Sequence, residues 1–196
     1  MSALPSQSRY IIGTEACERF SFYGMKSILM LYMTGHLLMS DNWATSTLHI
    51  FMGMVYLLPL AGAWLADKVW GRYKTILYIS LLYCVGHGVL ATADLFHTIE
   101  ARRYILMAGL FIIALGAGGI KPCVSAFMGD QIPNKSPQLM TKAFNAFYWA
   151  INLGSFFSFL VIPAMEQRYG YSWAFAVPGL FMGVATFVFW LGRKKY

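Results

Sequence analysis

Four charged residues lie close together in the first long apolar stretch of the chain: Glu15, Glu18, Arg19 and Lys26. A charge at the centre of a membrane helix costs roughly 2.5–3.5 kcal/mol, so these four would cost about 10 kcal/mol or more if they faced lipid. We therefore expect them to face a protein interior or a water-filled cavity, where acids and bases can pair. Acidic side chains in such a place favour proton handling.

The composition indicates a membrane protein. Hydrophobic residues make up 58% of the chain, charged residues 12%, and the mean hydropathy is +0.56. A soluble domain usually carries about 25% charged residues. The net charge of +7 comes without a basic, aromatic-interleaved stripe, which favours lipid headgroups over nucleic acid as the partner. The three cysteines lie in apolar runs and predict buried free thiols rather than disulfides or a metal site.

The apolar segments predict an all-α membrane protein that forms a single domain over 1–196. Each holds about 20 residues or more, which is enough to cross roughly 30 Å of hydrocarbon. No phosphate-binding glycine loop and no nucleophile elbow occur in the sequence, so an enzyme is not expected. Six spans are expected, at 10–38, 47–67, 75–96, 103–127, 142–163 and 173–192.

Basic residues in the connectors predict the orientation. Nine fall on the side that holds the N-terminus and three fall on the other side, so both termini are expected in the cytoplasm of a multi-pass protein of the plasma (inner) membrane. The nine are Arg9, Lys68, Arg72, Lys74, Lys135, Lys142, Arg193, Lys194 and Lys195, and the three are Arg102, Arg103 and Arg168.

Polar groups from four spans are expected at similar depth. With a rise of 1.5 Å per residue, they lie about 7–16 Å from the cytoplasmic ends of their spans. The groups in this layer are Glu15, Glu18, Arg19, Tyr56, Lys121, Tyr148 and Asn152. In the first span, positions 15, 18, 19, 22, 23 and 26 share an arc of about 140°, which is one helix face. Glu15 and Arg19 stand in the favourable i,i+4 order.

The stretch E-A-C-E-R-F-S-F-Y-G at 15–24 resembles the ExxERFxYY signature of the proton-dependent oligopeptide transporters (the POT family), within the major facilitator superfamily. Runs at 116–131 and 147–155 agree with the same family, and 62–74 resembles the superfamily's loop motif between spans two and three. The resemblance covers nearly the whole chain. It corresponds to the N-terminal six-helix half of a usual twelve-span transporter, built as two inverted three-helix repeats.

The resemblance implies roles for individual residues. Glu15, Glu18 and Arg19 would couple proton movement to substrate movement, with Lys121 as their counter-charge. His49 shares the spacing of a proton-sensing histidine in animal members, although a single histidine at this depth is also typical of an interfacial side chain. The implied substrate-binding residues are Tyr23, Lys26, Tyr56, Tyr148 and Asn152. The implied loop-motif residues, which would clamp a short turn, are Asp67, Gly71, Arg72 and Lys74.

Two positions depart from the family pattern, and one proline adds an expectation. Phe22 replaces the first tyrosine of the signature, which removes one expected pocket hydroxyl. Lys26 replaces arginine, which keeps the charge but loses the bidentate fork. Pro122 removes a backbone donor beside Lys121 and is expected to interrupt the helix there. Tyr148 and Asn152 could also be hydrogen-bond partners between helices.

The implied function is proton-coupled symport of di- and tripeptides, driven by the proton gradient without another cofactor. Burial favours the neutral form of a carboxyl group and a nearby cation favours the ionised form, so movement of Arg19 or Lys121 would switch proton affinity. A second six-helix half is the expected partner, as a missing C-terminal half, a split partner or a second copy. Two alternatives stay open: transport of another small solute such as nitrate, and a non-transporting membrane partner or regulator derived from a half transporter.

Overall fold

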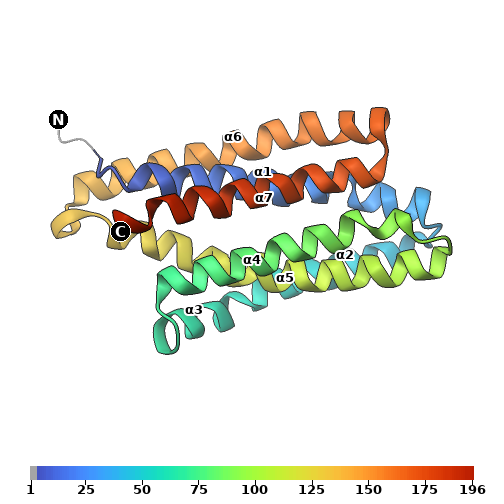
Figure 1. The fold of residues 1–196 in the computed structure, drawn as a ribbon, viewed down its shortest axis with the longest axis horizontal. Helices are drawn as coiled ribbons and strands as arrows, with labels where there is room; N and C mark the ends of the chain where they lie inside the picture. The colour runs from blue at the N-terminus through green and yellow to red at the C-terminus, as the bar shows by residue number, and fades with distance from the viewer. Residues whose placement is uncertain (1–3) are drawn as a thin grey trace.

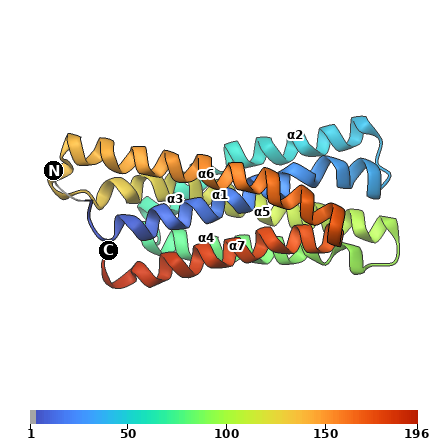
Figure 2. The ribbon, with the colours of Figure 1, turned by 90° about the horizontal axis from the view of Figure 1, so that it is seen from above.

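The computed structural model describes residues 4–196, so the first three residues of the predicted domain 1–196 lie outside the described part. The regular elements of the described residues are all helical, and the long helices run side by side along one axis (Figures 1 and 2). The elements are α1 (Ser8–Leu31), η1 (Tyr32–His36), α2 (Asp41–Leu57), α3 (Pro59–Lys68), α4 (Arg72–Ala91), η2 (Ala93–Leu95), α5 (Ile99–Asp130), η3 (Pro133–Lys135), α6 (Pro137–Tyr169), α7 (Tyr171–Leu191) and η4 (Gly192–Lys194).

Five helical segments in residues 4–196 are long and apolar enough to cross a membrane. They are Asp41–Lys68, Arg72–Leu95, Ile99–Asp130, Pro137–Tyr169 and Tyr171–Lys194. The first helix, α1, has 24 residues and is also long enough, but its charged residues reduce its hydropathy. That α1 crosses the membrane as a sixth span stays a prediction.

Capping groups and prolines set the helix boundaries. Ser40 accepts a hydrogen bond from the backbone N–H of Trp43 at the start of α2, and Thr98 does the same for Ala101 at the start of α5. The predicted second span is divided at Leu58 into α2 and α3, because α3 begins with a proline that cannot donate to the preceding turn.

The expected interruption beside Pro122 is wrong. The α5 helix runs without a break from Ile99 to Asp130. It packs against α2, α3 and α4, and such neighbours allow a membrane helix to tolerate a proline. The contact with α3 is a close backbone approach, since a Cβ atom on Gly62 would lie 2.6 Å from the Cα atom of Gly119.

The packing places α1 inside the molecule. It lies between α6 and α7, while α4 packs against α5 and α7 (Figures 1 and 2). Both ends of the chain lie at one end of the bundle, together with the α3–α4 and α5–α6 connections (Figure 1). We call this the terminal end and the opposite one the distal end. The charged face of α1 therefore lies within the protein rather than on its surface.

Candidate functional site

Three charged side chains of α1 form a buried cluster. Glu15, Glu18 and Arg19 are 6%, 1% and 4% exposed. The Nε atom of Arg19 lies 3.2 Å from Oε1 of Glu15, and the same guanidinium donates to Glu18. Glu15 lies one helical turn before Arg19, at the i,i+4 spacing, whereas Glu18 directly precedes Arg19 in the sequence. The expectation that these charges avoid the surface of the protein is confirmed, whereas their role in coupling stays a prediction.

Lys121 of α5 lies beside this cluster without an ion pair to any described carboxylate. Its Nζ atom lies 5.3 Å from the ring centre of Phe22 and 5.4 Å from that of Tyr56. The ammonium interacts electrostatically with Glu15 and Glu18 from beyond ion-pair distance. The structure thus brings the fourth predicted charge to the site, but places it against aromatic rings.

The cluster holds more positive than negative charge. Arg19, Lys26 and Lys121 carry three positive charges, and Glu15 and Glu18 carry at most two negative ones. Lys26 is half-buried on the same face of α1 and interacts electrostatically with Lys121. One positive charge is therefore left over when both acids are ionised, and a bound anion could balance it.

A polar layer on α4 lies next to the cluster and was missed by the sequence reasoning. Tyr83 and His87 are fully buried, and their rings stack with centres 5.0 Å apart. Ser21 of α1 lies 2.9 Å from Nε2 of His87. The Tyr83 hydroxyl and Oε1 of Glu18 are both buried without a hydrogen-bond partner among the described residues. The sequence does contain a signal for this layer, because Tyr83 and His87 are polar residues four positions apart in an apolar span.

The predicted substrate-binding tyrosines differ in exposure. Tyr23 is half-buried, and its ring contacts Phe22 and Phe159. Tyr56 and Tyr148 are 69% and 61% exposed. Tyr56 is the only one of the three that contacts Lys121 through a described ring contact. The three hydroxyls therefore do not form a closed pocket within this chain.

Tyr148 and Asn152 line an open pocket of about 350 Å³ on α6, together with Asn145 and Trp149. The amide of Asn152 donates to the backbone oxygen of Tyr148 at 2.8 Å. This bond lies within α6, so the described hydrogen bond of the Asn152 side chain does not join two helices. The pocket faces away from the bundle and offers polar groups to a partner or ligand.

His49 and the loop-motif residues lie apart from the cluster. His49 is exposed on α2. At the terminal end, Arg72 pairs with Asp130 and lies 3.7 Å from Asp67. Gly71 precedes α4 with a φ of 77°, a conformation that glycine adopts without strain. Asp130 was not expected in this clamp, because it lies 58 residues after Arg72 in the sequence and no local pattern places the two side chains together.

Lys74 is the fourth loop-motif residue, and it is exposed on the first turn of α4. The described contacts of the turn involve Arg72 and the two aspartates rather than this lysine. The clamp therefore ties the start of α4 to the ends of α3 and α5.

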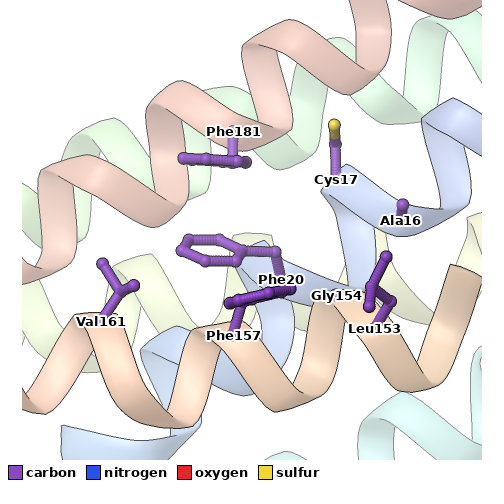
Figure 3. Close-up of a pocket in the computed structure, with 8 residues that line it drawn as sticks. All are labelled: Ala16, Cys17, Phe20, Leu153, Gly154, Phe157, Val161 and Phe181. Carbon is purple, nitrogen blue, oxygen red and sulfur yellow. The ribbon is translucent and has the colours of Figure 1, made fainter.

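A separate apolar groove of about 370 Å³ lies between α1, α6 and α7. Figure 3 shows Phe20 and Phe181 facing one another in it, with ring centres 4.0 Å apart. The remaining lining residues are Ala16, Cys17, Leu153, Gly154, Phe157 and Val161. With no charged residue in its lining, this groove is not a candidate for proton or peptide chemistry.

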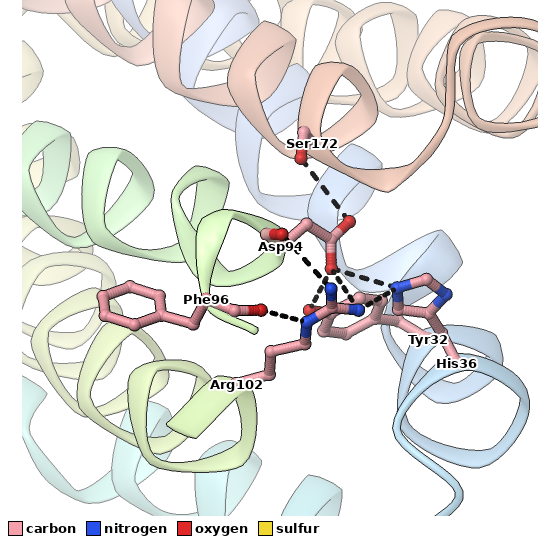
Figure 4. A network of polar contacts seen from close by, with 6 residues as sticks. All are labelled: Tyr32, His36, Asp94, Phe96, Arg102 and Ser172. Atoms are coloured by element: carbon pink, nitrogen blue, oxygen red, sulfur yellow. Dashed lines mark hydrogen bonds and ion pairs between the residues drawn. The ribbon is translucent and has the colours of Figure 1, made fainter. Parts of the chain in front are cut away.

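A second polar network joins four helical segments at the distal end (Figure 4). Its centre is Asp94 of η2, whose Oδ1 atom accepts from the Tyr32 hydroxyl at 2.9 Å and lies 3.1 Å from Nε2 of His36. Ser172 of α7 donates to the other oxygen at 3.4 Å. Arg102 of α5 lies 3.1 Å from the same histidine nitrogen. This network, called the distal network below, ties the ends of the helices together.

The chain is similar to known membrane transporters. The family description "PTR2: POT family" matches residues 73–196. Human solute carrier family 15 member 2 is 41% identical over 203 residues, covering 100% of this chain and 28% of the relative. Peptide transporter 3 of Caenorhabditis elegans is 40% identical over 204 residues, covering 100% of this chain and 29% of the relative. The chain thus spans less than a third of the length of these relatives.

Solved structures agree with the same family. The crystal structure of the POT family transporter PepTSo superposes with a TM-score of 0.90 at 47% identity, over 100% of this chain and 39% of that one. A peptide transporter POT in complex with sulfate gives 0.88 at 33% identity, over 97% and 38%. These likenesses and the apolar helices identify an all-α, integral multi-pass membrane protein. The chain belongs to the POT family.

Proposed function

We propose that this chain is the proton-coupling half of a symporter that moves di- and tripeptides across the cell membrane with protons. The observation that carries the proposal is the buried group of Glu15, Glu18 and Arg19 beside a lysine without an ion pair. Such a group is costly to bury, so it favours function over a purely structural ion pair. The names of the relatives, which include peptide transporters, support the same class of cargo.

Proton coupling follows from competition for the two carboxylates. Arg19 holds both of them in the described structure. When Lys121 approaches one carboxylate, that acid is held in its ionised form and releases its proton. When Lys121 withdraws, the acid is again able to take up a proton. Under this proposal the proton gradient is the driving force, and no other cofactor takes part.

The excess positive charge suggests how a peptide is held. Arg19, Lys26 and Lys121 outnumber the two acids, so the carboxylate of a peptide would neutralise the interior. Exposed Tyr56, and Tyr148 with Asn152, would supply hydrogen bonds along the peptide. His49, exposed on α2, is proposed as a point of proton entry.

Because these substrate-binding groups are exposed, the proposal requires further protein from outside the chain to complete the peptide-binding site. We propose that six further helices cover the faces of α2 and α6, as a C-terminal half, a split partner or a second copy. The orientation with both termini in the cytoplasm belongs to the same proposal and rests on the excess of basic residues at the terminal end.

The test reconstitutes the chain in liposomes with a six-helix half that completes a twelve-helix transporter. An inward proton gradient is expected to drive accumulation of a labelled dipeptide. Glu18→Gln is expected to abolish this accumulation but to keep peptide–peptide exchange, because an amide cannot carry the coupled proton. Glu100→Gln is the matched control, since it makes the same change at an exposed acid.

Two results would overturn the proposal: unchanged proton-driven accumulation in Glu18→Gln, and no dipeptide accumulation by the unsubstituted protein. The chain alone, without a second half, is expected to give weak or no uptake.

The excess of interior positive charge also suits a small anion, so nitrate is the second candidate cargo. A competition panel in the same liposomes separates the two. Unlabelled dipeptides are expected to block uptake of the label, and nitrate is expected to leave it unchanged. Co-purification with another six-span chain without any proton flux would instead favour a non-transporting partner or regulator.

A further inference from the structure

Two aromatic rings from different helices surround the Lys121 ammonium. Phe22 comes from α1 and Tyr56 from α2, and their ring centres lie 5.3 Å and 5.4 Å from the Nζ atom. Both distances are within the range at which a cation is attracted by the face of a ring. We call Phe22 and Tyr56 together the lysine cage. The attraction is strongest where water is excluded, as it is on the side of Phe22.

We propose that the lysine cage holds Lys121 in a parked position, away from Glu15 and Glu18, until a ligand contacts Tyr56. Phe22 and Tyr56 are then positioning residues that act through the lysine. The consequence for coupling rests on the proposed function, whereas the cage itself does not.

The charges around Lys121 explain why its ammonium contacts aromatic rings rather than carboxylates. Arg19 already engages both Glu15 and Glu18. Arg19 and Lys26 also repel the lysine, because all three groups are cationic and share one interior. A neutral ring attracts a cation without competing for the acids. The cage therefore keeps a mobile positive charge close to the acids and yet separate from them.

The two walls of the cage differ in freedom to move. Phe22 is 1% exposed and packs against Phe51, with ring centres 6.2 Å apart. Tyr56 is 69% exposed and lies two residues before the break at Leu58. A peptide that stacks on Tyr56 or bonds its hydroxyl would shift only this wall. The lysine would then lose one of its two rings and move toward a carboxylate, which links peptide binding to proton release.

Phe22 has a different role in the structure from the one that the sequence suggested. The sequence suggested that phenylalanine here costs the pocket a hydroxyl, but the side chain is buried and its ring faces two cations. The Cζ atom of Arg19 lies 5.7 Å from the same ring centre. The aromatic face, which tyrosine would also provide, is the property that the site uses.

The first experiment observes the lysine directly in the purified chain, in lipid nanodiscs, by NMR with isotope-labelled lysine. The Lys121→Gln variant identifies its signal. We expect the ring currents of the cage to displace the signals of the lysine side chain from those of exposed lysines. Phe22→Leu is expected to remove most of this displacement and Phe22→Tyr to keep it. Phe20→Leu is the control, because Phe20 is a buried aromatic of α1 that stacks on Phe181.

This measurement needs neither peptide nor a proton gradient, so it can fail or succeed independently of the proposed function. A Lys121 signal at the position of exposed lysines in the unsubstituted chain would overturn the cage. So would a displaced signal that stays in place in both Phe22→Leu and Tyr56→Leu.

The second experiment tests the positioning role in the completed transporter. Phe22→Leu is expected to lower proton-driven accumulation about tenfold while peptide–peptide exchange stays within about twofold, since a desolvated cation–ring contact is of that strength. Phe22→Tyr is expected to restore accumulation, and Phe20→Leu to leave the ratio of accumulation to exchange unchanged. Full accumulation in Phe22→Leu, or an equal loss of exchange, would overturn the positioning role.

Discussion

The interior cluster and the distal network each contain one arginine, but the two arginines have different surroundings. Arg19 is 4% exposed and faces two acids, and a further lysine stands unpaired nearby. Arg102 has a side chain that is 24% exposed and one acid, Asp94, as its neighbour at 3.9 Å. In the distal network Arg102 also donates to the backbone oxygen of Phe96 at 2.7 Å. The interior cluster contains a lysine that has no ion pair to a described carboxylate, whereas the arginine of the distal network lies beside its aspartate.

The two groups differ also in how fully their atoms are bonded. Both oxygens of Asp94 accept hydrogen bonds, from Tyr32 and Ser172. In the interior cluster, Oε1 of Glu18 and the Tyr83 hydroxyl are buried without partners among the described residues. A polar network that joins helix ends is most stable when each of its donors and acceptors has a hydrogen-bond partner. The interior cluster is not saturated in this way.

The largest expected effect is a loss in the free energy of unfolding when the arginine of the interior cluster is replaced. Arg19→Met is expected to lower it by about 3–5 kcal/mol, because two buried acids lose their paired cation. The measurement is equilibrium unfolding of the chain in lipid. Adding Glu15→Gln and Glu18→Gln to the same chain is expected to recover most of the loss. A cost below about 1 kcal/mol for Arg19→Met would show that the cluster behaves like a surface ion pair.

Asp94→Asn is expected to cost less, about 1–3 kcal/mol of the same free energy, because Arg102 keeps its backbone partner and water can reach the group. Asp41→Asn, at an exposed acid of the same end, serves as the control. If Asp94→Asn were as costly as Arg19→Met, the two groups would not differ in their contribution to the free energy of unfolding.

The smallest expected effect is in the salt dependence of these costs. Raising the salt concentration is expected to reduce the cost of Asp94→Asn by about half, since partly exposed charges are screened. The cost of Arg19→Met is expected to stay the same, because ions do not enter the buried cluster. Unfolding curves of both variants at low and high salt make the comparison. Equal salt dependence would contradict the difference in burial.

Much of the architecture followed from the sequence because membrane burial leaves few choices. Long apolar runs can only be helices, and charges within them must turn inward, which is why Glu15, Glu18 and Arg19 were expected to lie together. The boundaries were less predictable. The helix α6 continues beyond the predicted span, to Tyr169, since hydropathy marks the extent of hydrocarbon and not the end of hydrogen bonding.

The contacts between segments far apart in the sequence could not be predicted. The ring of Phe22 beneath Lys121 depends on how α1 and α5 rotate about their axes, which no local pattern specifies. The Asp94 network joins residues up to 78 positions apart, and its histidine gave no signal beyond its residue type. Pro122 was misjudged because its effect on α5 is decided by neighbouring helices rather than by its own ring.

The glycine contact between α3 and α5 has a mechanical consequence. Gly62 and Gly119 bring the two backbones together two residues from Lys121, with no side chain between them to absorb movement. Asp67 and Arg72 flank the turn that follows α3. If α3 tilts, the part of α5 that contains Lys121 is expected to move with it. The turn at the terminal end and the segment of α5 that holds Lys121 are thus mechanically linked through the α3–α5 contact.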